Sequence, residues 1–306
     1  MTTFNVLMDC SPAADDALRY AVQLVQHLLS RHLPAQLRLL AVLPASHDEA
    51  APYFTALAGW TPRQAAGYLQ RQLQALPPAL RTDPEVVTGA VAAELALRLR
   101  PNGADILVLG RSTGTAAPLH HPSLYLCRLL PQPLLLVPAA ASAAAPPTRV
   151  VLDTDGLPVH LSRTAHHVAD LLLSLCHDSR VLYLSPGRPA VRQLIQQLLP
   201  KAAGIHVYTA DEPVPQPAEV LERLTEIGLL AGLPHTLHTA YHESVEQGII
   251  ELVQAHAADL LVFVARQFSL PEADFYQSPG AGLMQRSPVP TLVVPEAAPV
   301  PWTRCV

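Results

Sequence analysis

Short unbroken apolar runs alternate with stretches of helical spacing along the first half of the chain. Runs without polar alternation are typical of parallel strands that are covered on both faces. The pattern therefore predicts five strands in this half, at residues 5–8, 37–43, 85–88, 106–109 and 134–137.

The segments between these runs predict helices. One apolar stripe recurs at steps of three and four residues, as expected for a helix that buries one face; its members are Ala17, Leu18, Ala21, Leu24, Val25 and Leu28. Ser11-Pro12 opens this helix as an N-cap and first helical residue, with Asp15 and Asp16 near the positive end of its dipole. A second helix is expected from Thr61-Pro62 to Leu76, where two prolines stop it.

The chain repeats its own pattern. Val6-Leu7-Met8-Asp9 is matched by Val150-Val151-Leu152-Asp153, Ala104-Asp105 before an apolar run by Ala258-Asp259, and residues 133–138 by residues 290–295. Since the order of these elements is the same in both copies, an internal duplication is indicated.

This duplication predicts two α/β domains in tandem, each a doubly wound parallel sheet with right-handed crossovers. The expected bounds are 1–138 and 148–296, joined by an Ala/Pro linker at 139–147 and followed by a tail at 297–306. The second domain has its own helical stripe (Ala165, Val168, Ala169, Leu172 and Cys176) and a strand at 180–184. Residues 205–209 could be an extra strand or an extended segment before a helix around 219–230, and we favour the extended segment.

Composition narrows the function. The chain has 306 residues, 50% of them hydrophobic and 15% charged, with a net charge of −5. One lysine and no Lys/Arg run argue against a nucleic-acid partner, and no apolar stretch approaches the length of a membrane span. The start lacks a signal-peptide pattern, and four scattered cysteines without a CxxC pair suggest reduced thiols. We expect a cytoplasmic protein.

With these segments in view, the chain resembles a tandem universal stress protein. In both halves an apolar first strand ends in an acid, a second strand ends in Leu-Pro or Leu-Ser-Pro, an Ala-Asp-apolar strand comes late, and Pro-x-x-x-Val-Pro closes the domain. The resemblance implies a Rossmann-like fold of the adenine-nucleotide alpha-hydrolase type, a role in the stress response and, in some members, ATP or AMP binding.

Nucleotide-binding members of that family carry Gly-x-x-Gly, nine residues, and then Gly-Ser or Gly-Thr after the fourth strand. The resemblance implies that Asp9 and the Val42 backbone would hold adenosine, with Gly110, Arg111, Ser112, Thr113 and Gly114 near phosphate. Glycines let backbone N–H groups approach an anion. Here, however, Gly114 comes one residue late, and His120-His121 stands where the final Gly-Ser is expected.

The second copy retains less of this motif. Val264 or Ala265 replaces the first glycine, and Gln277-Ser278 replaces Gly-Ser, so Ser278 alone survives. Ser278 could contact a phosphate or cap the next helix, and we favour the cap. For Asp9 the ligand and capping interpretations remain open, while for Asp153 we favour capping. Any ATP or AMP is therefore expected to bind weakly and in the first domain.

No catalytic or metal constellation is visible. Fourteen histidines are present, but His120-His121 and His166-His167 are adjacent pairs that would diverge on a helix, and His235 and His238 would face opposite sides of a strand. There is no Gly-x-Ser-x-Gly elbow, and we interpret Tyr241-His242-Glu243 as a capping segment.

We therefore expect a stress-response protein that acts through conformation and an unidentified protein partner, without turnover; the alternative is an ATP- or AMP-binding regulator. The resemblance also implies that the two halves pair internally through their last strands, residues 134–137 and 291–294, and this pairing would cover an apolar edge strand. The whole chain is also expected to form a homo-dimer, the commonest symmetric assembly.

Overall fold

The computed structural model describes residues 1–45, 54–57, 59–100, 103–111, 121–141, 145–154, 160–161, 163–175, 178–185, 222, 225–226, 228–229, 235–242, 244–266 and 270–297. Several predicted features lie outside these residues, among them the segment 205–209, most of the helix around 219–230, and Cys176 and Cys305.

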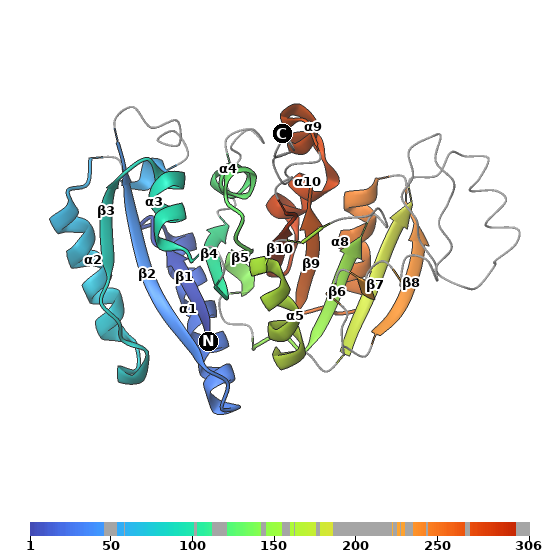
Figure 1. The fold of residues 1–306 in the computed structure, drawn as a ribbon, viewed down its shortest axis with the longest axis horizontal. Helices are drawn as coiled ribbons and strands as arrows, with labels where there is room; N and C mark the ends of the chain where they lie inside the picture. The colour runs from blue at the N-terminus through green and yellow to red at the C-terminus, as the bar shows by residue number, and fades with distance from the viewer. Residues whose placement is uncertain are drawn as a thin grey trace, which may run out of the picture.

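The described chain builds one ten-stranded sheet with helices on both faces (Figure 1). Its strands are β1 (Thr2–Leu7), β2 (Ala35–Pro44), β3 (Glu85–Gly89), β4 (Asp105–Arg111), β5 (Leu134–Pro138), β6 (Arg149–Thr154), β7 (Asp178–Ser185), β8 (His235–Tyr241), β9 (Leu260–Ala265) and β10 (Thr291–Pro295). The principal helices are α1 (Pro12–Ser30), α2 (Pro62–Ala75), α3 (Val91–Arg98), α4 (Pro122–Leu129), α5 (Arg163–Leu175), α8 (Val245–Ala255), α9 (Glu272–Gln277) and α10 (Pro279–Arg286). The expected α/β class is confirmed.

The strand order is β3-β2-β1-β4-β5-β10-β9-β6-β7-β8. From the centre outward it reads 5-4-1-2-3 on one side and 10-9-6-7-8 on the other, so β6 to β10 repeat the arrangement of β1 to β5. We call β1 to β5 with their helices the first half, and β6 to β10 with theirs the second half. All pairs within a half are parallel, as the unbroken apolar runs predicted.

The two halves join through an antiparallel pair in the middle of the sheet. Leu135 of β5 lies opposite Leu292 of β10, with Leu134 opposite Val293 and Leu136 opposite Thr291. The predicted pairing of these two strands is confirmed. Because this one pair is antiparallel, the carboxyl ends of the two sets of parallel strands lie at opposite edges of the sheet.

The helix starts follow from local sequence. Ser11 caps α1 by accepting a hydrogen bond from the Ala14 N–H, and Pro12 follows it as the first helical residue. Thr61 and Gln64 form a capping box at the start of α2. Since a cap satisfies backbone donors that the helix leaves free, these residues explain where both helices begin.

Two apolar layers cover the sheet. One contains the stripe of α1 together with α5, and it includes Val168 and Leu172 of the predicted second stripe. The other lies under α3, α4, α8 and α10. Each layer contains residues of both halves, so the packing is continuous across the β5–β10 seam.

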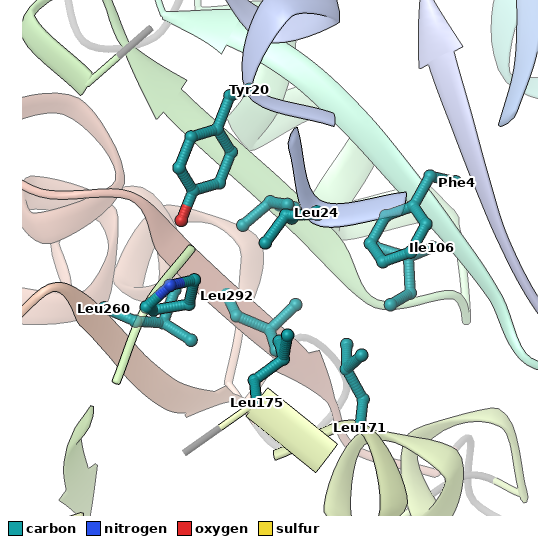
Figure 2. Close-up of a pocket in the computed structure, with 10 residues that line it drawn as sticks. Phe4, Tyr20, Leu24, Ile106, Leu171, Leu175, Leu260 and Leu292 are labelled. Carbon is teal, nitrogen blue, oxygen red and sulfur yellow. The ribbon is translucent and has the colours of Figure 1, made fainter. Parts of the chain in front are cut away.

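A small apolar cavity lies in the first layer at this seam. Figure 2 shows that residues of both halves line it: Phe4, Tyr20, Leu24, Ile106, Leu135, Pro147, Leu171, Leu175, Leu260 and Leu292. The predicted linker contributes to the same packing, because Ala141 in the 3₁₀ turn Ala139–Ala141 is buried and Pro147 lines the cavity. These two positions of the predicted linker are therefore packed against the sheet rather than exposed.

Candidate functional site

The residues predicted to form a nucleotide site gather at the carboxyl ends of β1, β2 and β4. In open α/β sheets ligands bind at this edge, where loops replace the strand ladder. Asp9 follows β1, Val42 lies near the end of β2, and Gly110 and Arg111 end β4. Ser112, Thr113 and Gly114 lie outside the described residues, as does His120.

Asp9 already has a local partner. One of its carboxylate oxygens accepts a hydrogen bond from the Ser11 N–H at 3.0 Å. This side chain-to-backbone bond spans two residues, a turn that Asp commonly stabilises. Cys10, between them, has a φ of 63°. The carboxylate thus supports the tight turn that leads into α1, which is the capping interpretation of Asp9.

Val42 offers its backbone at the same edge. The Met8 N–H donates to the Leu40 carbonyl at 2.7 Å, while the Ala45 N–H donates to the Gly89 carbonyl of β3 at 3.1 Å. Backbone groups of a strand point alternately to its two sides. Val42 has the same parity as Leu40, so its backbone groups point toward the β1 side, beyond the end of the β1 ladder.

The chain's own side chains cover the carboxyl end of β2. Leu43, Leu57 and Ala65 form a small buried cluster, and Cys10 and Trp60 pack against it. Trp60 also meets the Tyr68 ring edge-on, with centroids 6.0 Å apart. Burial, and then the charges of Asp9 and Asp15, raise the pKa of the Cys10 thiol to about 11, so this cysteine stays protonated and weakly reactive.

Gly110 is required by packing. A Cβ added at this position would lie 1.9 Å from the Ala13 carbonyl oxygen and 2.6 Å from the Ala14 nitrogen. The first turn of α1 therefore rests directly on the β4 backbone, which only a residue without a side chain permits. This contact accounts for a glycine at the end of β4 without any ligand.

Arg111 turns away from that contact, toward the second half. Its side chain is buried, 8% exposed, and its Nη2 donates to the carbonyl oxygen of Ser287, directly after α10. Burial lowers the pKa of the guanidinium to about 10. The sequence indicated a positive charge in a glycine-flanked loop, but it did not indicate this contact with a residue 176 positions away.

The helix after this loop, α4, begins with a proline. Pro122 is the first residue of α4 and His121 is its N-cap residue, although His121 makes no side-chain capping bond. Its Nδ1 lies 2.6 Å from the Ser123 hydroxyl oxygen. Burial, and then the charge of Arg111, lower the pKa of His121.

The corresponding residues of the second half lie at the opposite edge of the sheet. Asp153 is half-buried within β6. Ser278 caps α10: its hydroxyl accepts from the Ala281 N–H at 3.3 Å and donates to the Phe275 carbonyl at 2.7 Å. The expected N-cap is present. Ala265 of β9, opposite Pro295, takes the place that Arg111 has opposite Pro138 in the first half.

One polar cluster was not anticipated. Asp15 accepts hydrogen bonds from the Tyr68 hydroxyl and from the Gln72 amide, which joins the start of α1 to α2. Burial, and then the bond to Asp15, raise the pKa of Tyr68. Tyr68 and Gln72 share a face of α2 at a four-residue step, but only the tertiary arrangement shows that this face meets Asp15.

A metal site is also absent from the part of the chain that the structure describes. No group of three or more His, Cys, Asp or Glu side chains there could hold a metal ion. His242 accepts from the Ser244 N–H ahead of α8, as expected for a capping segment; Glu243 lies outside the described residues. Cys10 and Cys127 are free thiols. Among the described helices, none has the length and hydropathy needed to cross a bilayer.

The sheet topology, together with the residues at the carboxyl ends of β1, β2 and β4, defines the class of protein. It is a Rossmann-like α/β protein in which the two halves of the sheet meet edge to edge. Residues 1–138 match the model of the Universal stress protein family. This match covers 138 of the chain's 306 residues.

Solved structures share the fold at low sequence identity. A universal stress protein from Archaeoglobus fulgidus DSM 4304 is 12% identical and superposes with a TM-score of 0.57, covering 96% of this chain and 98% of its own. A functionally unknown protein from Pseudomonas aeruginosa PAO1 is 13% identical, with a TM-score of 0.51 and coverage of 97% and 93%. No curated protein sequence matches the chain.

Proposed function

We propose that this is a stress-response protein of the universal stress type, which acts through conformation and partner binding without turnover. One observation carries the proposal. At the carboxyl edge of the first half, Asp9, Gly110 and Arg111 are each engaged within the chain, by the Ser11 N–H, the α1 backbone and the Ser287 carbonyl respectively. A ligand site is normally recognised by polar groups left available to a ligand.

A second candidate function, an ATP- or AMP-binding regulator, is favoured by a different observation. Asp9 and the Val42 backbone lie at the ends of the neighbouring strands β1 and β2, and the Val42 groups point toward β1. A carboxylate and a backbone donor–acceptor pair at adjacent strand ends could bind the ribose and the base. This site would belong to the first half, with Asp153 and Ser278 taking no part.

Calorimetric titration of the purified chain with ATP and with AMP separates the two candidates. The leading proposal expects no saturable heat and no phosphate release above the buffer blank. The regulator expects saturable binding that Asp9→Asn removes, because the amide loses the negative charge but keeps an oxygen for the Ser11 N–H. Asp153→Asn is the matched control in the second half and should retain that binding.

The proposed unit of function is a homo-dimer of the whole chain. The β5 and β10 edges are already paired with each other, so this dimer would use other surfaces. Light scattering at micromolar concentration should give about twice the chain mass of 32.9 kDa. A single-chain mass at every concentration tested would refute this assembly.

A further inference from the structure

β3 is the last strand at one end of the described sheet, so its outer side has no neighbouring strand there (Figure 1). One bond shows which of its backbone groups point outward. The Ala45 N–H donates to the Gly89 carbonyl, so the backbone groups of Gly89 face β2. Because the backbone groups of a strand alternate between its two sides, the N–H and C=O groups of Val86 and Thr88 point away from the sheet.

The described chain leaves this edge open. α2 and α3 pack on opposite faces of the sheet, and each contacts both β2 and β3, so neither helix closes the outer side of β3. Edge strands are usually protected from association by a proline or by a charge. β3 contains no proline, and its one charged residue, Glu85, is paired with Arg38 and Arg98.

An exposed hydrophobic side chain lies beside the same edge. Glu94 of α3 reaches the end of β3, where a Cβ added at Gly89 would lie 2.6 Å from the Glu94 Oε1. Leu97 follows Glu94 by three residues and therefore lies on the same flank of the helix. At 78% exposed, Leu97 is the most exposed of the large hydrophobic side chains described. Within one chain it packs against little, so it is available for association rather than for the fold.

We propose that a second copy of this chain binds at this edge, with the two β3 strands paired antiparallel about a two-fold axis through Val87. A two-fold axis makes the same patch serve on both copies. In this register Val86 lies opposite Thr88 of the second copy, and the two residues exchange both of their backbone hydrogen bonds. Glu85 falls opposite Gly89, so no like charges face each other. All residues of β3 are paired, and the sheets of the two chains become continuous.

The chain already uses this kind of junction internally. Its two halves join through the antiparallel β5–β10 pair, in which Leu135 lies opposite Leu292. Because that edge of the first half is occupied, β3 is the edge of the first half that is left for a second copy. At the new seam Val87, half-buried on the α3 face, would meet its own copy, and Leu97 would add to the contact. This inference rests on the homo-dimer of the proposed function and names its interface.

Cysteine cross-linking tests the register. The two copies of Val87 form a non-hydrogen-bonded pair, whose Cα atoms lie about 4.5 Å apart, within the span of a disulfide. Val87→Cys should therefore give a covalent dimer under mild oxidation, seen on a non-reducing gel. Thr88→Cys is the matched control, because the two copies of Thr88 lie on a diagonal of about 7–8 Å, beyond that span. The unmodified chain, which has four cysteines, gives the background.

Light scattering tests the backbone bonds. The unmodified chain at micromolar concentration should have about twice the chain mass of 32.9 kDa. Thr88→Pro removes an outward N–H and leaves the β2 ladder intact, since proline is tolerated at an edge where the N–H faces solvent. This variant should have the mass of one chain. Thr88→Ala keeps the N–H and should remain a dimer.

The outcomes separate this interface from the homo-dimer itself. An unmodified chain that is monomeric at every concentration would refute the homo-dimer, and the interface with it. A dimer that persists in folded Thr88→Pro, or a Val87→Cys chain that cross-links no more than Thr88→Cys, would overturn the β3 interface and leave the homo-dimer standing. If Thr88→Pro fails to fold, the cross-linking comparison decides.

Discussion

Gly110 and the Ala13 carbonyl face each other so closely that a Cβ on Gly110 would lie 1.9 Å from the Ala13 oxygen. The contact joins the end of β4 to the first turn of α1, and the neighbouring residues Val108 and Ala14 are buried in the same layer. Since backbone atoms on both sides must move to admit even a methyl group, this position is a packing requirement of the first half.

Gly110→Ala should therefore destabilise the protein. Forcing a methyl group into a filled site costs about 1–3 kcal/mol or more, and urea unfolding should show the loss as a lower midpoint with an unchanged slope. Gly67→Ala is the control, because a Cβ there meets nothing nearer than the Arg71 guanidinium at 3.8 Å. In the interior of α2 this change should stabilise by about 0.5–1 kcal/mol. An unchanged midpoint for Gly110→Ala would contradict the packing account.

Because of this contact, a Gly110 variant cannot distinguish the loss of a ligand contact from the loss of packing. Gly110→Val would displace α1 whether or not a nucleotide binds, so the loss of an ATP-dependent thermal shift in that variant would not identify a phosphate site. Asp9→Asn keeps the local turn and is the better probe of the first half.

Ser278→Ala should lower stability without changing any response to ATP. The Ser278 hydroxyl caps α10, and the loss of an N-cap costs about 1 kcal/mol. Ser278→Asp should remain close to the unmodified chain, because aspartate is an equally good N-cap residue and its charge suits the helix dipole. Thermal unfolding with and without ATP measures both effects. An ATP-dependent shift that disappears in Ser278→Ala would instead assign a ligand role to this serine.

The repeated Ala-Asp pair shows why the sheet could be predicted from the sequence. Asp105 accepts from the Arg100 N–H and guanidinium, and Asp259 accepts from the N–H groups of Thr148 and Arg149. Each acid ties the start of its strand to a neighbouring segment, so the apolar run and its acid recur together. Hydrophobic periodicity and caps are local properties, and they predicted the strands and the starts of α1, α2 and α10.

The state of the candidate site depends on contacts that sequence patterns do not contain. Arg111 and Ser287 are brought together only because β5 and β10 pair in the antiparallel sense. The glycine at position 110 is visible in the sequence, but its reason, the approach of Ala13, is tertiary. Motif spacing could therefore indicate a glycine-flanked loop without showing which of its side chains the fold itself uses.

Leu292→Ala should destabilise both halves together. Leu292 is 1% exposed, lies opposite Leu135 across the seam and lines the apolar cavity there. Removing a buried leucine costs about 2–5 kcal/mol, and calorimetry should show one transition at lower temperature, since both apolar layers cross the seam. Leu97→Ala, at a position 78% exposed, should stay within about 0.5 kcal/mol. Two separate transitions in the unmodified chain would contradict a shared core.

Protonation of Asp259 should lower the free energy of unfolding in acid. Burial alone would raise the pKa of this carboxyl, but hydrogen bonds from Thr148 and Arg149 outweigh burial and hold the pKa below its ordinary value. Between the lowered pKa of the folded state and the pKa of about 3.9 in the unfolded state, the unfolded chain binds more protons than the folded chain. The stabilisation that ionised Asp259 gives the folded state is therefore complete above about pH 4, and it is lost as the pH falls through the folded-state pKa. Urea unfolding at pH 7 and pH 3 should show a smaller difference between the two pH values in Asp259→Asn than in the unmodified chain. Thr148→Val, which removes the hydroxyl donor at 3.0 Å but keeps the backbone donor, should lie between them. Equal pH dependence in all three proteins would show that these hydrogen bonds do not set the acid sensitivity.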